Sequence, residues 1–170
     1  LTSNQFVIVY VGRSEGRKGY DFLLSLWENY FKNNNEFKLL ICGIKSSKFD
    51  ISNILHLGFV ENISEILAIS NCLILPSKHE GLPYEILESL ASQCPVIASD
   101  IPGIKSLIKN NENGILIKNF DEKEYFEKIL YLKDNPKFRN FVIKKGKICA
   151  EKYSRDKFLI AYQNFILNLA

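Results

Sequence analysis

The chain alternates between short, unbroken apolar runs and longer segments in which apolar residues recur every three or four positions. The apolar runs are residues 6–11, 37–42, 54–57, 72–75, 96–98 and 115–117, and each has the length of a β-strand that is buried on both faces. The periodic segments are residues 20–32, 62–69, 84–93, 104–108, 121–132, 136–152 and 155–169, and they predict helices. This alternation predicts an α/β fold, a doubly wound parallel sheet of six strands with helices on both faces.

Residues that favour element ends support these boundaries. Pro76 ends the fourth apolar run, and Pro83 is expected at the first position of the next helix, where its missing N–H costs nothing. Asn62 or Ser64 is expected to cap the helix that follows the third strand, and Asp121 the helix that follows the sixth.

Length and composition exclude several classes of protein. The 170 residues, of which 46% are hydrophobic and 24% charged, predict one globular domain spanning residues 1–170. No apolar run approaches the roughly 20 residues of a membrane-spanning helix. A net charge of +3 is mild, and we expect no stripe of lysines and arginines with interleaved aromatics, so nucleic acid is not an expected partner. The chain begins with Leu and has no Met, which predicts that it is part of a longer protein.

The four cysteines show no metal-binding pattern. Cys42, Cys72, Cys94 and Cys149 form no CxxC pair and have no histidine at ligand spacing. We expect them to be reduced and structural, which indicates a cytoplasmic setting.

Polar loops follow three of the predicted strands, at residues 12–19, 58–61 and 77–81. In a doubly wound sheet, the loops after the first and fourth strands flank the crevice where ligands bind. Arg13 and Lys18 lie in the first loop and suit a diphosphate, although solvated surface charges are an open alternative. The loop GRSEGRKG is not a Walker P-loop and matches GxGxxG poorly.

Two carboxylates, Glu80 and Glu88, stand eight positions apart beside this crevice. They could form an acid/base pair or accept hydrogen bonds from sugar hydroxyls. Glu85 is a competitor, but its place in a first helical turn is explained by the helix dipole alone. His56 and His79 are isolated histidines, with a slightly better functional case for His79.

The segment PSKHEGLPYEILESLASQCPVIASDIPG, which contains Glu80-Gly81 and Glu88, resembles the EX7E region of the group 1 family of retaining, nucleotide-sugar-dependent glycosyltransferases with the GT-B fold. Four other segments are similar to that family in order and spacing. VGRSEGRKGYDFLL resembles its GR…KG loop, and LLICGI its second strand. HLGFVENISEILAISNCLILPS resembles its base-binding turn, helix and strand, and NENGILIKNFD the segment that precedes a later helix. The resemblance spans residues 6–168.

The resemblance implies roles for individual residues. Arg13 and Lys18 would hold the pyrophosphate of the donor, with Gly12 beside them, and would stabilise the leaving nucleoside diphosphate without a metal. Glu80 would accept hydrogen bonds from the transferred sugar, so Arg13, Lys18 and Glu80 are the implied catalytic residues. Other implied donor-binding residues are Gly81, Leu82 and Pro83 at the sugar, Glu88 at the ribose, and Gly58, Phe59 and Val60 at the base. Leu82 stands where the family often has Phe, and Pro102-Gly103 where it often has Gly-Gly.

A GT-B enzyme has two Rossmann-like domains, and the resemblance covers the C-terminal, donor-binding one. We therefore expect a nucleotide-sugar-binding domain without its N-terminal acceptor-binding half, which binds a UDP- or GDP-linked sugar weakly and transfers nothing alone. No cofactor is expected beyond the donor substrate. The last helix resembles the one that packs toward the other domain, so we expect an exposed apolar face that supports self-association.

The resemblance implies that the full enzyme transfers sugar to a saccharide or lipid-linked acceptor in cell-surface polysaccharide or glycolipid synthesis, such as capsule or lipopolysaccharide. It would work in the cytoplasm, and peripheral association with the membrane is left open. Two alternatives remain. One is a GT-B-related sugar-nucleotide epimerase. The other is a non-catalytic signalling module, which would need an acidic residue where the first strand ends in Gly12-Arg13 or the third in Gly58.

Overall fold

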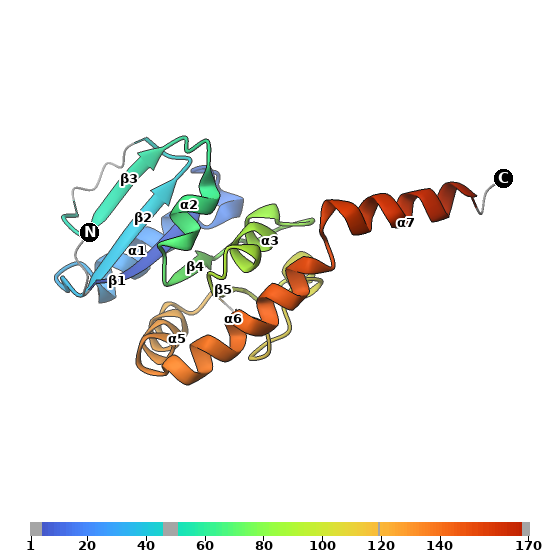
Figure 1. Cartoon of the computed structure of the whole chain (residues 1–170). Coiled ribbons are helices and arrows are strands. Elements are labelled where there is room, and N and C mark those ends of the chain that lie inside the picture. Colours follow the sequence, from blue (N-terminus) through green and yellow to red (C-terminus); the bar gives the residue numbers. More distant parts are fainter. Residues whose placement is uncertain (1–4, 46–50, 119, 168–170) are drawn as a thin grey trace.

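A computed structural model describes residues 5–45, 51–118 and 120–167 (Figure 1). Its strands form one parallel sheet in the order β3-β2-β1-β4-β5-β6. The strands are β1 (Phe6–Val11), β2 (Phe37–Cys42), β3 (Ile54–Gly58), β4 (Cys72–Leu75), β5 (Val96–Ser99) and β6 (Ile115–Ile117). This order confirms the predicted doubly wound, Rossmann-like α/β fold.

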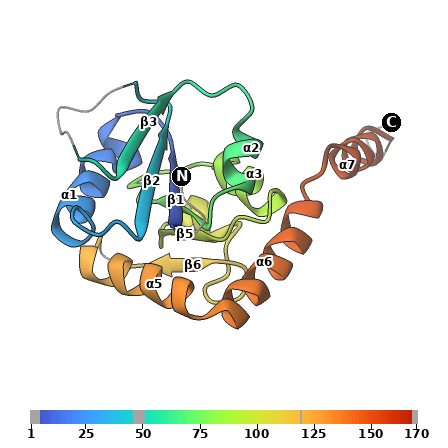
Figure 2. The same ribbon diagram turned by 60° about the vertical axis from the view of Figure 1, so that its left-hand side comes forward.

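The helices cover both faces of the sheet, and Figure 2 shows α1 and α5 on one side and α2 and α3 on the other. They are α1 (Tyr20–Tyr30), α2 (Ile63–Ala68), α3 (Tyr84–Ala91), α4 (Pro102–Lys105), α5 (Glu122–Asp134), α6 (Pro136–Glu151) and α7 (Arg155–Leu167), with a 3₁₀ turn at Gly16–Lys18. Because a strand's side chains alternate between faces, β1 sends Ile8 and Tyr10 into the core under α1 and α5, and Val7 and Val9 into the core under α2, α3 and α4. Burial on both faces explains why the strands read as continuous apolar runs.

A buried asparagine connects the sheet to α1. Asn53 is 3% exposed. Its Oδ1 accepts a hydrogen bond from Trp27 Nε1 at 2.8 Å, and its Nδ2 donates to the Phe31 carbonyl at 2.7 Å and the Asn34 carbonyl at 3.1 Å. A polar side chain is tolerated in this core because its hydrogen-bonding groups are paired.

Several predicted element ends were wrong by a few residues. Pro83 is the N-cap of α3 and not its first helical residue. Helix α4 begins at Pro102, two residues before the predicted start, because proline suits the first helical position. Asn62 occupies the N-cap of α2, but its side chain accepts from Ser64 Oγ at 2.6 Å instead of capping the helix. The predicted cap at Asp121 is confirmed, since its side chain accepts from the backbone N–H groups of residues 123 and 124.

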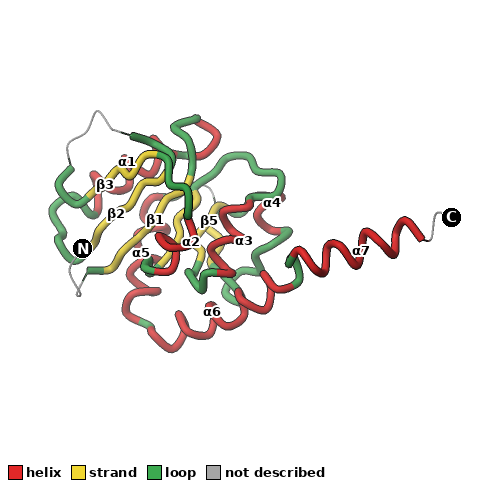
Figure 3. Tube along the Cα trace, turned by 45° about the horizontal axis from the view of Figure 1, so that its top comes forward, coloured by secondary structure: helices red, strands yellow, loops and turns green. Residues whose placement is uncertain are grey.

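The last two helices extend past the sheet. The buried side chain of Val142 in α6 joins the core of α1 and α5, whereas Cys149 packs against the core of α2, α3 and α4. Helix α7 projects away from the rest of the chain (Figures 1 and 3). Its described large apolar side chains are exposed, namely Phe158, Leu159, Ile160, Tyr162 and Phe165, as predicted for part of this helix.

The four cysteines are all free thiols, and three of them are buried, in agreement with their predicted role as small core residues. Among the described residues, none of the helices is both long and apolar enough to cross a bilayer.

Candidate functional site

The reversal of strand order lies between β1 and β4, which are neighbours in the sheet. From β1 the chain continues to β2 on one side, and from β4 it continues to β5 on the other. The loops that follow β1 and β4 therefore diverge at the carboxyl edge of the sheet and leave a crevice between them. Residues 12–19 and 76–83 form these loops.

The two loops are joined through their backbones. The Lys78 N–H donates to the Arg17 carbonyl at 2.7 Å. Gly19 has a φ of +72°, and a Cβ at this position would lie 1.8 Å from the Pro76 carbonyl oxygen. Only glycine fits here, because any side chain would collide with the backbone of the opposite loop. This contact fixes Lys18, the neighbouring residue, against the loop after β4.

Lys18 links two carboxylates on the opposite loop and helix. Its Nζ lies 2.8 Å from Glu80 Oε1 and also forms an ion pair with Glu85 Oε1. The side chains of Lys18, Glu80 and Glu85 are only 15%, 7% and 13% exposed. Burial lowers the pKa of Lys18, but hydrogen bonds from its ammonium to Glu80 and Glu85 outweigh this effect and raise its pKa above the ordinary value. We call this group the lysine–glutamate triad. The triad brings one ammonium group and two carboxylates, which can accept hydrogen bonds, together in the crevice.

Arg13, the second predicted cation, lies on the surface of the same loop. Its Nη1 lies 3.1 Å from Glu15 Oε1, and its side chain is 79% exposed. Arg17 contacts the other oxygen of Glu15 at 2.9 Å. The Arg13 carbonyl accepts a hydrogen bond from the buried Tyr10 hydroxyl at 3.0 Å, so its backbone is fixed while its guanidinium stays exposed in the pair with Glu15.

Gly12 and Gly58 lie at the same sheet edge and are connected through Cys42 and Gly43 at the end of β2. The Gly43 N–H donates to the Gly58 carbonyl at 2.6 Å, and the Gly12 N–H donates to the Cys42 carbonyl at 3.0 Å. Beyond Gly58, the ring of Phe59 is 85% exposed, and Val60 packs against the core under α2 and α3. An exposed aromatic ring at this edge offers a flat surface for stacking.

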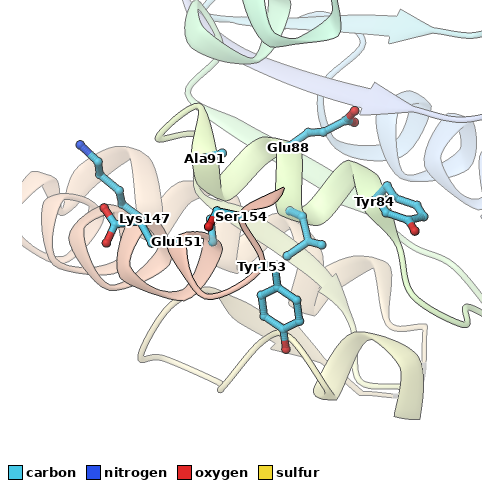
Figure 4. Close-up of a pocket in the computed structure, with 9 residues that line it drawn as sticks. Tyr84, Glu88, Ala91, Lys147, Glu151, Tyr153 and Ser154 are labelled. Atoms are coloured by element: carbon cyan, nitrogen blue, oxygen red, sulfur yellow. The ribbon is translucent and has the colours of Figure 1, made fainter. Parts of the chain in front are cut away.

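Glu88 lies on α3, one turn beyond the triad. It lines a pocket of about 430 Å³ between α3 and the end of α6, together with residues such as Tyr84 and Tyr153. In Figure 4 the Glu88 carboxylate points away from Tyr153 and Lys147, so only its stem faces this pocket. Partial burial, and then the charge of Glu85, raise the pKa of Glu88.

The remaining predicted residues lie around Glu80. Gly81 is exposed, Leu82 is 45% exposed and Pro83 is buried. Gly103 in α4 supports this loop from behind, because a Cβ there would lie 2.1 Å from the Glu80 carbonyl oxygen and 2.6 Å from that of Gly81. The small residue at this position lets α4 approach the loop that carries Glu80.

Sequence reasoning missed two members of the site. The prediction that the helix dipole alone explains Glu85 is wrong, because its carboxylate binds Lys18 across the crevice. No sequence signal pointed to Ser77, whose hydroxyl is fully buried in the loop after β4 and has no hydrogen-bond partner within the described part of the chain. Glu85 lies five residues after Glu80 and across Pro83, and no sequence periodicity connects the two.

The fold is that of the GT-B glycosyltransferases. A crystal structure of Staphylococcus aureus TarM in complex with fondaparinux, alpha-GlcNAc-glycerol and UDP superimposes with a TM-score of 0.82 at 26% identity, over 95% of this chain and 35% of that one. The sequence profile of the family described as "Glycosyl transferases group 1" matches residues 1–148. The chain belongs to this family.

Curated relatives agree with this assignment. The chain is 26% identical to an uncharacterized glycosyltransferase of Haemophilus influenzae, over 94% of the chain and 48% of that protein. It is 28% identical to a poly(ribitol-phosphate) alpha-N-acetylglucosaminyltransferase of Staphylococcus aureus, over 93% of the chain and 34% of that protein. The chain thus spans half or less of the length of these relatives.

Proposed function

We propose that this chain is the donor-binding domain of a glycosyltransferase that transfers a sugar from a nucleoside diphosphate to a saccharide or lipid-linked acceptor. The observation that carries the proposal is the contact of Lys18 with Glu80 across the switch-point crevice, at 2.8 Å. A cation beside a hydroxyl acceptor suits a ligand in which a diphosphate is joined to a sugar. The S. aureus relative is named as a poly(ribitol-phosphate) alpha-N-acetylglucosaminyltransferase, and this name supports sugar transfer as the reaction.

The residues divide the donor between them. Lys18 and the exposed guanidinium of Arg13 neutralise the diphosphate, on which negative charge grows as the bond to the sugar breaks. Glu80 accepts hydrogen bonds from sugar hydroxyls, with Gly81, Leu82 and Pro83 beside it. Glu88 accepts hydrogen bonds from the ribose hydroxyls. The turn from Gly58 to Val60, which follows β3, binds the base.

We further propose that the intact enzyme needs no divalent metal, because two side-chain cations supply the positive charge at the leaving group. We also propose that the transferred sugar keeps its anomeric configuration. The acceptor-binding half would come from a second domain. Capsule, lipopolysaccharide or wall polymer synthesis at the cytoplasmic side of the membrane is the proposed setting. Activity that survives EDTA, and an α-linked product from an α-linked donor by proton NMR, are the expected results.

Calorimetric titration of the chain with UDP, GDP and ADP tests the donor site. The same titration on Arg13→Ala and Arg17→Ala gives a matched pair, since both arginines are exposed and both contact Glu15, at 3.1 and 2.9 Å. We expect saturable binding of one nucleotide, weakened about tenfold by Arg13→Ala and unchanged by Arg17→Ala, since one charge-assisted hydrogen bond contributes about 1.5 kcal/mol.

Equal losses of nucleotide affinity in the two arginine variants would show that the effect comes from net charge alone. This result would argue against the assigned diphosphate site. If no nucleotide binds at millimolar concentration, the titration is repeated on the longest form of the enzyme that carries both domains. A second failure there would overturn the proposal.

A further inference from the structure

The solvent side of α6 carries one continuous stripe of lysines and apolar side chains. Its members recur at one-turn steps along the helix and are all exposed: Lys137, Phe141, Lys144, Lys145, Ile148 and Lys152. Phe141 is 44% and Ile148 54% exposed, and Lys145 Nζ lies 5.9 Å from the Phe141 ring centroid. The opposite side of the helix holds the buried residues Val142 and Gly146. The helix brings these residues onto one surface although they are scattered in sequence.

A small pocket lies directly beside this α6 stripe. It has a volume of about 250 Å³, and four lysines line it: Lys105, Lys109, Lys145 and Lys152. One of them, Lys105, is paired with Asp100 at 3.0 Å, and Glu112 is the single acidic residue of the lining. The other three lysines are exposed. The pocket has the size and charge to accept a phosphate group.

Charge is unevenly distributed over the chain. Residues 136–157 contain eight Lys or Arg and two Asp or Glu, a net charge of +6, so the other 148 residues together carry −3 to give the whole-chain value of +3. A positive surface that also exposes large apolar side chains matches the interface of an anionic bilayer, where lysines meet headgroups and rings enter the acyl boundary. Tyr153, which is 46% exposed, continues the surface at the end of α6.

We propose that the α6 stripe and its lysine pocket dock this domain onto a membrane that contains anionic phospholipids. Nucleic acid would use the lysines but would leave Phe141 and Ile148 without a partner, so a lipid surface accounts for more of the stripe. Docking through α6 would hold α3 close to the bilayer, because the end of α6 borders the same pocket as Tyr84 and Glu88. The inference does not depend on the proposed function, since it concerns a surface outside the nucleotide crevice.

Vesicle co-sedimentation of the chain tests the proposal, with phosphatidylcholine alone and with about 30% phosphatidylglycerol added. The test variant is Lys144→Glu/Lys145→Glu/Lys152→Glu. Its control is Lys32→Glu/Lys118→Glu/Lys123→Glu, which makes the same change in net charge at exposed lysines on other parts of the chain. Each lysine near an anionic surface contributes about fivefold to binding, so the test variant is expected to lose about 125-fold or more and the control less than fivefold. Circular dichroism verifies that both variants are folded.

Phe141→Ser/Ile148→Ser separates the apolar part of the surface from its charge. We expect this variant to bind anionic vesicles at least tenfold more weakly, because it lacks the two exposed apolar side chains that would enter the bilayer. Equal binding to neutral vesicles would overturn the proposal, because it would indicate simple adsorption through α7. Equal losses in the two lysine variants, or full binding by the serine variant, would also overturn it. So would displacement of the chain from vesicles by duplex DNA at equal phosphate concentration.

Discussion

Replacement of Lys18 by methionine is the perturbation that tests the lysine–glutamate triad most directly. The variant leaves the Glu80 and Glu85 carboxylates close together, with side chains only 7% and 13% exposed, and without their shared cation. Two unit charges 4 Å apart interact by about 4 kcal/mol at an effective dielectric constant near 20. Loss of hydration on burial offsets much of this attraction. Breaking a fully buried pair costs about 3–5 kcal/mol, and the remaining exposure of all three side chains reduces our expected loss to about 2–3 kcal/mol.

Urea unfolding monitored by the fluorescence of Trp27 measures this loss, and a fall in Tm of about 5–10 °C is expected alongside it. In the wild type the pKa of Lys18 is raised in the folded state. Its stabilising contribution is therefore complete below the unfolded value of about 10.4 and is lost only as the pH rises through the higher folded value.

Two companion variants make the result interpretable. Lys18→Met combined with Glu85→Gln should recover about half of the loss, because one carboxylate no longer needs a cation. Lys78→Met removes an exposed lysine from the neighbouring loop and should stay within about 0.5 kcal/mol of the wild type. A Lys18→Met protein as stable as the wild type at pH 7.5 would refute this account of the triad.

Three further predictions concern the framework of the site. Asn53→Ala should lower the free energy of unfolding by about 2–4 kcal/mol in urea titration, because the indole N–H of Trp27 loses its buried acceptor. Burial lowers the pKa of His56 in the folded chain, so as the pH falls the unfolded chain binds a proton first. The free energy of unfolding should therefore decrease below about pH 6.5. This part of the decrease should disappear in His56→Gln. Gly103→Ala should weaken nucleotide binding at least tenfold by calorimetry, since its Cβ would lie 2.1 Å from the Glu80 carbonyl oxygen and displace that loop.

Each of these has its own control. Gly16→Ala is the match for Gly103→Ala, because a Cβ at Gly16 has no neighbour within 4 Å, and equal effects of the two would contradict the steric argument. Asn34→Ala keeps Asn53 intact and should cost well under 1 kcal/mol. For His56→Gln, an acid limb of the stability curve that is unchanged from the wild type would show that other groups cause it.

The sheet could be predicted from the sequence because each strand is covered on both faces and is therefore an unbroken apolar run, as in Val7 to Val9 of β1. Helix ends were less predictable, since proline fits both the N-cap and the first helical position, and Pro83 and Pro102 occupy one each. The cap at Asp121 could be found because a carboxylate accepts from N–H groups two and three residues ahead.

The candidate site could be predicted only in part. The crevice and the proximity of Lys18 to Glu80 followed from strand order and from family resemblance. The role of Glu85 depends on which way a lysine from another loop turns, which local sequence does not specify. The burial of Ser77 and the support from Gly103 likewise depend on how separate segments pack, and these tertiary contacts leave no periodic signal.

The close approach of Gly19 to the Pro76 carbonyl has a consequence for any attempt to change donor choice by exchanging loops. Because the loop after β1 rests directly on the backbone that follows β4, an insertion in either loop shifts the other. A graft of residues 12–19 from a relative would carry a curvature fitted to that relative's own second loop. The two loops should therefore be exchanged together. A change of donor specificity should require both segments, with the glycine and the carbonyl that it faces taken from the same relative.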